Sequence, residues 1–485
     1  MKKYNLLLLF IGFGFIFTSC EDLSTNLDTQ FAEDPTPAET VSENTAKNIF
    51  RGWYNTVNAY EGPGLAMTTM ADMGTCSWGN QGMRDMSSEP RIAWNNSTSY
   101  GYRSVTQTFF NSIYALLSDS NNLLAKLANE GPTVYENPKR VEALARFGQA
   151  AYIGYIGLVF DRVWLTDEDG ARNNGESVSP MVALDYSLEQ IDKAIQIAEN
   201  NTFDVDSEFI NGVTLTSAQF AQFLNTFAAR LMVNMARNSA QRDATDWQRV
   251  LNYANKGLTY DLSVVSDGWT TWYSEWIYLQ IYPGWGRVDM RVINLMVPST
   301  IDHWTSSNGT LAQLNSADSR LTSDMQYQSS QWFIPSRGLY HYSNYRHSRY
   351  DGAAHGSNWT GAMTEMLQAE NELYKAEAQM RLGNLAAAAA TINASSRVLR
   401  GGLAPVAANA SDIADAIHYE RSVELMNTGM GLGFFEMRRE NLLQVGTPLH
   451  FPIPGSALEA AGIENYTFGG TTGVAGEDYS TGGWR

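Results

Sequence analysis

The sequence predicts an all-α protein in which tetratricopeptide-like helix pairs form a scaffold that carries long irregular loops. Apolar residues recur at helical spacing over several long segments. One segment contains a glycine that separates two helices placed directly one after the other. Between the helical segments lie stretches rich in Gly, Ser, Thr, Asn and aromatic residues. Together these features predict helices that pack on their neighbours and loops that carry function.

The helical pattern is clear over residues 104–127, where Val105, Phe109 and Ile113 share one face. Such a face is apolar because it packs against neighbouring elements, so we expect these helices to border the core. The segments with this pattern are 104–127, 137–159, 183–199 and 217–237.

A helix pair is predicted over residues 370–393. Ala376-Glu377-Ala378 leads to Leu382-Gly383-Asn384 and then to the alanine run 386–390. Gly383 is expected to close one helix, because glycine adopts the left-handed conformation that ends many helices. Small alanine side chains let paired helices approach closely. The sequence shows no strict period of about 34 residues, so the tetratricopeptide-like repeats are expected to be divergent.

Composition indicates a globular protein with an uncharged ligand. The 485 residues are 44% hydrophobic, which is enough for a large core, and we expect a single domain over residues 41–485. Charged residues make up only 17%, below the roughly 25% of soluble domains. A net charge of −18 repels phosphate backbones and disfavours nucleic-acid binding. Aromatic residues reach 12%, with 13 Trp and 24 Tyr.

The N-terminus has the pattern of a lipoprotein signal peptide over residues 1–19. Lys2 and Lys3 precede an apolar run over residues 6–17, and Thr18-Ser19 precedes Cys20. The run is shorter than the roughly 20 residues of a transmembrane helix. We therefore expect cleavage before Cys20 and acyl chains on its sulfur. The alternative is an ordinary secretory peptide with an incidental cysteine.

Residues 20–40 are expected to be a lipidated, extended tether, because they are polar, contain Pro35 and Pro37 and show little periodicity. The chain has only two cysteines. If Cys20 carries lipid, Cys76 has no partner, and we expect it to be a buried small apolar residue. The glycine-rich segment 468–485 is expected to be loosely ordered.

Three loops combine aromatic residues with amides and arginines: residues 73–102, 261–286 and 332–360. Tryptophan and tyrosine offer flat faces to the C–H faces of sugars, and planar Asn and Arg give directed hydrogen bonds to hydroxyls. We therefore predict a glycan site in these loops. The candidate ligand-binding residues are Trp78, Asn80, Arg84, Trp94, Trp269, Trp272, Tyr273, Trp285, Tyr340 and Arg346.

Each loop has a second interpretation. Trp269, Trp272 and Trp276 recur at the spacing of a buried helical stripe, so packing explains them equally well. The run that holds Tyr340 and Arg346 could be a solvated loop or could pair with acids of a partner protein. Its histidines have irregular spacing, and no metal or cofactor is predicted.

Several short motifs follow one another along the chain: Asp318-Ser319-Arg320, Ala376-Glu377-Ala378 with Leu382-Gly383-Asn384, Glu420-Arg421 with Glu424-Leu425, Phe435-Glu436-Met437-Arg438-Arg439, and Pro452-Ile453-Pro454. In this order they resemble the SusD/RagB family. That resemblance implies a surface lipoprotein that hands nutrients to a SusC-like TonB-dependent outer-membrane transporter. The post-cysteine pair Glu21-Asp22 is similar to the family's export signal to the cell exterior. The family's "EGxR" element has no counterpart between Leu425 and Phe434, which leaves one structural ion pair open.

Catalytic signatures are missing from the sequence. It contains no GxSxG elbow, no HExxH helix and no Walker loop. We therefore predict a noncatalytic protein that captures oligo- or polysaccharide at the outer membrane. Two alternatives remain: a lipid-anchored α-helical glycoside hydrolase, and a tetratricopeptide-like scaffold whose only ligand is another protein.

Overall fold

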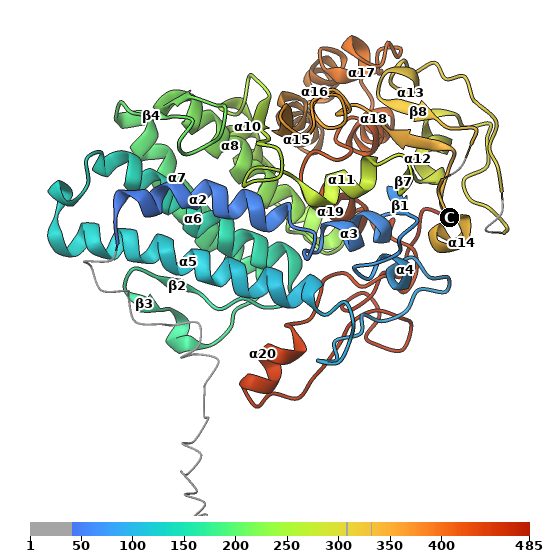
Figure 1. Cartoon of the computed structure of the whole chain (residues 1–485). Coiled ribbons are helices and arrows are strands. Elements are labelled where there is room, and N and C mark those ends of the chain that lie inside the picture. Colours follow the sequence, from blue (N-terminus) through green and yellow to red (C-terminus); the bar gives the residue numbers. More distant parts are fainter. Residues whose placement is uncertain (1–40, 307–308, 331) are drawn as a thin grey trace, which may run out of the picture.

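The computed structural model describes residues 41–306, 309–330 and 332–485, and helices packed side by side build most of it (Figure 1). The predicted signal peptide, the lipidation site at Cys20 and the tether lie outside the described residues. Within the described part of the chain, no helix is long and apolar enough to span a membrane.

The main helices form a continuous series in which each packs against the next. α6 contacts α2, α5 and α7, and α7 continues to α8. From α8 the series runs through α10 to α15, which packs against α16 and α18. The all-α, helix-pair architecture predicted from the sequence is confirmed. The bounds are α2 (Glu43–Val57), α5 (Ser104–Glu130), α6 (Pro138–Val159), α7 (Pro180–Asn200), α8 (Ser217–Asn234), α10 (Trp247–Asn255), α15 (Gln368–Arg381), α16 (Leu385–Asn393), α18 (Ala410–Val423) and α19 (Leu432–Arg439).

Local sequence explains where these helices begin and end. Asn137 caps α6 by accepting a hydrogen bond from the Arg140 N–H at 3.1 Å, next to Pro138 at the first position. Thr216 and Gln219 form a capping box on α8. Gly383 has a φ of 81° between α15 and α16. The predicted glycine stop is therefore confirmed, as are the four predicted single helices.

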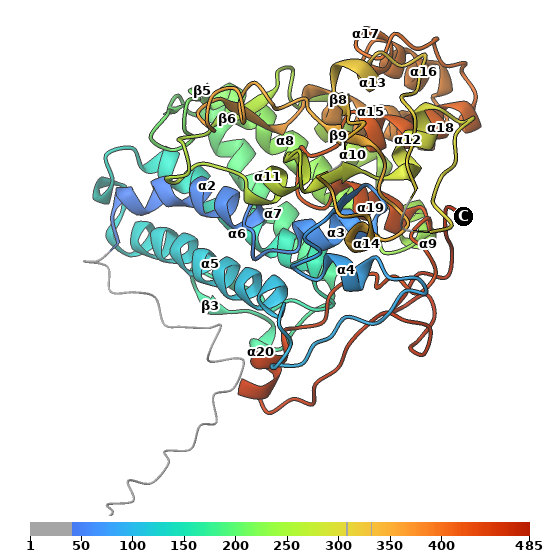
Figure 2. The same cartoon turned by 45° about the vertical axis from the view of Figure 1, so that its right-hand side comes forward.

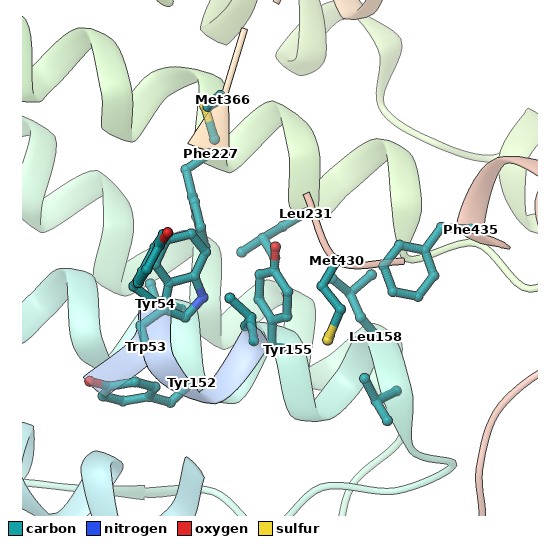
Figure 3. Packing of buried hydrophobic residues seen from close by; sticks show 14 of the residues in the cluster. Trp53, Tyr54, Tyr152, Tyr155, Leu158, Phe227, Leu231, Met366, Met430 and Phe435 are labelled. Carbon is teal, nitrogen blue, oxygen red and sulfur yellow. The ribbon is translucent and has the colours of Figure 1, made fainter. Parts of the chain in front are cut away.

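Aromatic side chains fill the core where α2, α6 and α8 meet (Figure 3). The Trp53 ring of α2 lies edge-on to Tyr155 of α6, with centroids 5.8 Å apart, and to Phe227 of α8 at 5.5 Å. Rings in this geometry stabilise a core by about 0.5–1.5 kcal/mol per pair beyond the area they bury. The amphipathic stripes read from the sequence meet here.

Short helices and two-stranded sheets connect and cover the main series. The described residues form five two-stranded antiparallel sheets: β1 with β7, β6 with β10, β2 with β3, β4 with β5, and β8 with β9. The strands are β1 (Gly74–Cys76), β2 (Thr166–Asp167), β3 (Gly170–Ala171), β4 (Asp204–Val205), β5 (Leu215–Thr216), β6 (Leu262–Val265), β7 (Gly286–Val288), β8 (Met325–Tyr327), β9 (Tyr345–His347) and β10 (Ala362–Met366). The short helices are α3 (Gly64–Met70), α4 (Met83–Met86), α9 (Ser239–Asp243), α11 (Glu275–Ile281), α12 (Met290–Met296), α13 (Arg320–Ser323), α14 (Pro335–Gly338), α17 (Ser396–Leu399) and α20 (Gly455–Ala460).

A buried ion-pair network joins α15, α18 and α19. The Glu377 carboxylate accepts hydrogen bonds from Arg421 and Arg439, each at 2.7 Å. Glu436 accepts a second bond from Arg421 at 2.9 Å. We call Glu377, Arg421, Glu436 and Arg439 the charge network. All four are buried, so each charge depends on the others for the solvation that it has lost.

A second buried set surrounds Arg320. Its guanidinium pairs with Asp318 at 2.7 Å, with Glu420 at 2.7 Å and with Glu424 at 3.0 Å. α13 is thereby fixed to α18. Both sets consist of residues from the short motifs singled out in the sequence.

The C-terminal tail is packed, so the expectation of loose order over residues 468–485 is wrong. The Ser480 N–H donates to the Thr447 carbonyl at 2.8 Å, and the Trp484 N–H donates to the Leu442 carbonyl at 3.0 Å. The Trp484 indole N–H also donates to the buried Asp72 carboxylate at 2.7 Å. Its glycines serve close turns against the body of the protein.

We predict that Glu377→Gln lowers stability and weakens its dependence on acid. Burial alone would raise the pKa of Glu377, but Arg439 and Arg421 outweigh it and lower the pKa from 4.5 to about 2. A depressed folded-state pKa stabilises above the unfolded value, and this contribution, on the order of 3 kcal/mol, is lost as pH falls from 4.5 to about 2.

Urea unfolding at neutral pH and at about pH 3 measures this effect. The variant should be less stable at neutral pH by about 3–5 kcal/mol, because two buried arginines lose a partner. Its unfolding free energy should also fall less on acidification. Glu208→Gln, at a surface pair with Lys47, is the control and should change little. Equal acid sensitivity in Glu377→Gln and the parent would contradict the assignment.

Candidate ligand-binding site

Seven aromatic rings form a continuous chain of contacts, which we call the aromatic ledge. Tyr282 and Trp285 stack with centroids 4.3 Å apart, and Trp78 meets Trp285 edge-on at 4.9 Å. Tyr278 joins Trp285 at 5.2 Å to Trp269 at 4.8 Å. The residues of the ledge are Trp78, Trp269, Tyr273, Tyr278, Tyr282, Trp285 and Trp359.

Strand pairing brings the first and second predicted loops together. β1 pairs with β7 so that Cys76 faces Gly286, and the Ser77 N–H donates to the Trp285 carbonyl at 2.6 Å. This register sets Trp78, just after β1, beside Trp285, just before β7. Figure 1 shows α3, α4 and α14 near these strands, and Figure 2 shows the same three helices close together from another side.

A second strand pair brings the third loop to the second. β6 pairs with β10, and beyond their ends the Gly268 N–H donates to the Trp359 carbonyl at 2.8 Å. The Ser266 N–H donates to the Gly361 carbonyl at 2.9 Å. The Trp269 and Trp359 rings therefore lie 5.1 Å apart, although they are far apart in the sequence.

The turn that carries Trp269 is held by one carboxylate. Asp267 Oδ1 accepts from the backbone N–H groups of Thr270, Thr271 and Trp272 at 2.9–3.0 Å. Within this turn Trp269 has a φ of 73°. A left-handed residue other than glycine costs about 1–3 kcal/mol and tends to occur at functional loops. Asn358 and Trp359 share this conformation on the facing loop, with φ values of 52° and 61°.

The ledge rests on a small apolar core of its own. Cys76, Trp276 and Ile281 belong to this cluster, and Tyr278 and Trp285 pack against it. Cys76 is buried and free, as the sequence predicted, and burial raises the pKa of its thiol to about 11. A packed base of this kind holds aromatic rings in position before a ligand arrives.

One end of the ledge borders a hollow of about 310 Å³, which we call the aromatic hollow. Burial lowers the pKa of His355, so its imidazole is uncharged at neutral pH. The described side chains that line the hollow therefore carry no formal charge at that pH. They are Trp269, Tyr278, Tyr282, Ala354, His355, Asn358 and Trp359.

Several predicted ligand residues lie on the ledge. Trp78 is 52% exposed and Trp269 is 37% exposed, while Tyr273 and Trp285 are half-buried. Arg84 is exposed on α4 near Trp78. Asn80 is half-buried and donates to the Tyr60 hydroxyl. Tyr340 is half-buried, and its carbonyl accepts from the Trp304 backbone N–H at 2.9 Å.

Three predicted ligand residues have no face open to a ligand in this structure. Trp94 is 1% exposed because the C-terminal region covers it. The Phe451 ring lies 5.0 Å from the Trp94 ring, centroid to centroid, and the Phe468 carbonyl accepts from the Trp94 backbone N–H. Trp272 is buried against Tyr54. We therefore leave both out of the proposed site.

Arg346 is also buried, and its role in the structure is to fix loops. Its guanidinium binds the Asp351 carboxylate at 2.8 Å, Gln326 at 2.7 Å and the Ile281 carbonyl at 3.0 Å. Gln326 lies on β8 and Ile281 on α11, far from Arg346 in the sequence. Asp351 is the nearby partner. The spacing of residues in the sequence does not reveal such distant partners. For this reason Arg346 was predicted to be available for a ligand.

Sequence reasoning did not single out Trp332, His355, Asn358 and Trp359, although all lie within the third predicted loop. Trp332 is 73% exposed, and it packs against Gly284, where a Cβ would lie 3.5 Å from the Trp332 Cβ. The turn-forming sequence Asn358-Trp359-Thr360-Gly361 was the available signal, since an aromatic residue in a tight turn cannot belong to a helical stripe.

A buried cluster of Asp72, Asp289 and His341 has ligand-type atoms within 4.8 Å of one another. Asp72 already accepts from Arg91 at 2.7 Å, from Gln444 at 2.8 Å and from the Trp484 indole. His341 Nε2 lies 3.1 Å from Glu89, and despite burial these carboxylates raise the pKa of His341. Arg91 offsets the charge of Asp72, and the bond from the Trp484 indole ties the C-terminal tail to this cluster. We therefore assign the cluster to anchoring the tail.

Another cavity, of about 430 Å³, lies between α12, α15, α18 and α19. Unlike the ledge, it is lined by many charged groups. We call it the charged cavity. Its lining includes Arg291, Arg381, His418, Glu436, Glu440 and Trp484.

The sequence matches no protein-family model and no curated protein. The structure, however, is similar to many solved structures described as SusD superfamily proteins. One from Parabacteroides distasonis has a TM-score of 0.60 and 15% identity, and the match covers 87% of this chain and 98% of that one. One from Bacteroides fragilis has a TM-score of 0.57 and 14% identity, over 88% and 100% of the two chains.

A third solved structure is described as a SusD-like carbohydrate binding protein from Bacteroides vulgatus. It has a TM-score of 0.52 and 13% identity, over 84% of this chain and 86% of that one. The chain therefore has the SusD-like fold across most of its length, as the sequence motifs implied.

Proposed function

We propose that this chain with the SusD-like fold is a member of the SusD/RagB family that captures oligo- or polysaccharide on the cell surface without cleaving it. The aromatic ledge is the observation that carries the proposal. A sugar ring has apolar C–H faces that stack on tryptophan and tyrosine. The ledge offers Trp78 and Trp269 as exposed rings beside half-buried ones, whereas Trp359, at 3% exposed, belongs to the fixed apolar base. A solved structure with the same fold is described as carbohydrate binding.

The charge of the site favours a neutral sugar. The aromatic hollow is lined by uncharged groups, and the whole protein carries a net charge of −18. Anionic ligands would have to approach against that charge, and the described residues that line the hollow offer them no guanidinium or ammonium group. Hydroxyl groups can instead bond to Asn358, to His355 and to the tyrosine hydroxyls.

The same lining weakens the hydrolase alternative. Glycoside cleavage needs two carboxyl groups about 5–10 Å apart across the scissile bond. Among the described residues that line the aromatic hollow, none carries a carboxylate. A binding role needs no such pair.

Delivery and attachment complete the proposal. A captured glycan would pass to a SusC-like TonB-dependent transporter, and Cys20 would anchor the protein to the outer membrane, facing outward. Two acyl chains are enough for stable anchoring.

Cys20→Ser should release the folded protein from the membrane. Serine has no sulfur to which the lipid could be attached, so the variant would lack its acyl chains. Fractionation of cells followed by detergent phase separation measures this, with Cys76→Ser as the matched control that stays in the membrane fraction. Membrane retention of Cys20→Ser would contradict the lipid anchor.

Trp269→Ala should weaken glycan binding by roughly 30-fold, since truncating an anchoring tryptophan costs about 2 kcal/mol. Affinity electrophoresis against a panel of neutral polysaccharides finds the ligand, and titration calorimetry gives the dissociation constant. Trp269→Phe should keep part of the affinity because a ring face remains.

Leu399→Ala, at an exposed side chain on α17 outside the ledge, is the control and should bind like the parent. Unchanged affinity in Trp269→Ala, with the protein folded, would overturn the proposed site. Release of new reducing ends from a bound glycan would instead support the hydrolase alternative.

A further inference from the structure

A second hollow, of about 190 Å³, lies across the wall formed by Trp269 and Tyr273. Trp269 lines the aromatic hollow, Tyr273 lines the second one, and their ring centroids are 4.8 Å apart. One pair of touching rings, tilted by 50° to each other, therefore contributes one ring to each of the two open spaces. We call the second space the polar hollow; its lining is Asn55, Asn58, Ala59, Thr270, Thr271, Tyr273 and Glu275.

We propose that the two hollows are adjoining subsites for one neutral oligosaccharide that crosses the Trp269–Tyr273 wall, so that chain length decides affinity. This inference rests on the proposed glycan-binding function and adds to it a second subsite and a class of ligand. The aromatic hollow takes one sugar unit by stacking, and the polar hollow takes a later unit by hydrogen bonds.

The polar hollow is rich in hydrogen-bond acceptors. Among the described residues, the Asn55 side-chain oxygen is buried and has no hydrogen-bond partner. Glu275 Oε2 accepts the Tyr60 N–H at 2.6 Å, which leaves its other oxygen for a ligand. Sugar hydroxyls are donors that satisfy both groups, and leaving a buried acceptor unsatisfied costs about 1–3 kcal/mol.

Among the described residues that line the polar hollow, Glu275 supplies one carboxylate and none supplies a cation, which sets the selectivity of this hollow. A uronic acid or a sulfated sugar would place its anion near Glu275 without a compensating charge. Burial, with Glu275 and Asp267 nearby, raises the pKa of Tyr273, so its phenol keeps its proton at neutral pH. Tyr273 can therefore donate to a sugar oxygen while Asn55 and Glu275 accept.

The walls of the polar hollow are fixed before a ligand binds. Asn58 donates to the Tyr54 carbonyl at 2.9 Å and accepts from the Trp276 indole at 3.0 Å. The Asp267 carboxylate holds the turn of Thr270 and Thr271. Little ordering is needed on binding, so contacts made there add to affinity rather than offset lost freedom.

Bridging both hollows makes the second contact intramolecular. Once one unit is stacked beside Trp269, the next units are held at high effective concentration near the polar hollow. A ligand too short to cross the wall gains nothing from it. Affinity should therefore rise with chain length and then level off once both hollows are filled.

Titration calorimetry on the full chain in detergent tests this with malto-, xylo- and manno-oligosaccharides, each from disaccharide to octasaccharide. The variants are Asn55→Ala and Glu275→Gln, the second keeping an acceptor for the Tyr60 N–H. Each should lower affinity for the long ligands about 3- to 10-fold, the effect of one lost hydrogen bond. Neither variant should change the affinity for the shortest ligand that binds.

A matched charge test uses an oligosaccharide of the bound series oxidised to carry uronic acids. The parent should bind it more weakly than the neutral form, and Glu275→Gln should recover part of the loss. Thermal unfolding checks that each variant is folded. If Asn55→Ala does not fold, Glu275→Gln alone tests the proposal.

The outcomes separate the two proposals. Affinity that is independent of chain length, with long ligands bound equally by both variants, overturns the two-subsite inference but leaves capture at the ledge in place. Failure of the parent to bind any member of the three series counts against the proposed function itself.

Discussion

The charge network of Glu377, Arg421, Glu436 and Arg439 is the constraint on which the rest of the molecule depends. The four charges are buried and pair with one another, so removing one deprives its partners of a compensating charge. Such a network tolerates few alternative packings, because each carboxylate has to meet its guanidinium in one geometry. It fixes α15, α18 and α19 in their mutual positions.

From this network the constraint extends to the ligand site. α19 packs against α3, and α3 leads into β1, whose pairing with β7 aligns Trp78 with Trp285. Arg346 fixes the facing loop through Asp351 and Gln326. Rigid helices thus support loops that would otherwise be mobile, and the left-handed backbone at Trp269 persists because its surroundings over-determine it. The buried charged residues hold the helices of the scaffold together, whereas the described side chains that line the aromatic hollow are uncharged.

Much of the fold could be predicted from the sequence, and the site only in part. Amphipathic stripes and the Gly383 stop depend on local patterns, so α5 to α8 and the α15–α16 pair were found. The three loops were located because their composition does not suit a core. Which tryptophan faces outward was not readable, because it depends on distant segments: Phe451 and the tail cover Trp94, and Tyr54 covers Trp272. Trp359 reaches Trp269 only through the β6–β10 pairing, which no local pattern encodes.

The central claim is that a neutral glycan lies on the aromatic ledge, and a crystal structure of the protein grown with a bound oligosaccharide tests it most directly. We expect density for a sugar ring stacked on Trp269, with neighbouring units extending into both hollows. Density confined to the charged cavity beside Arg291, Arg381 and Trp484, with the ledge empty, would contradict the account.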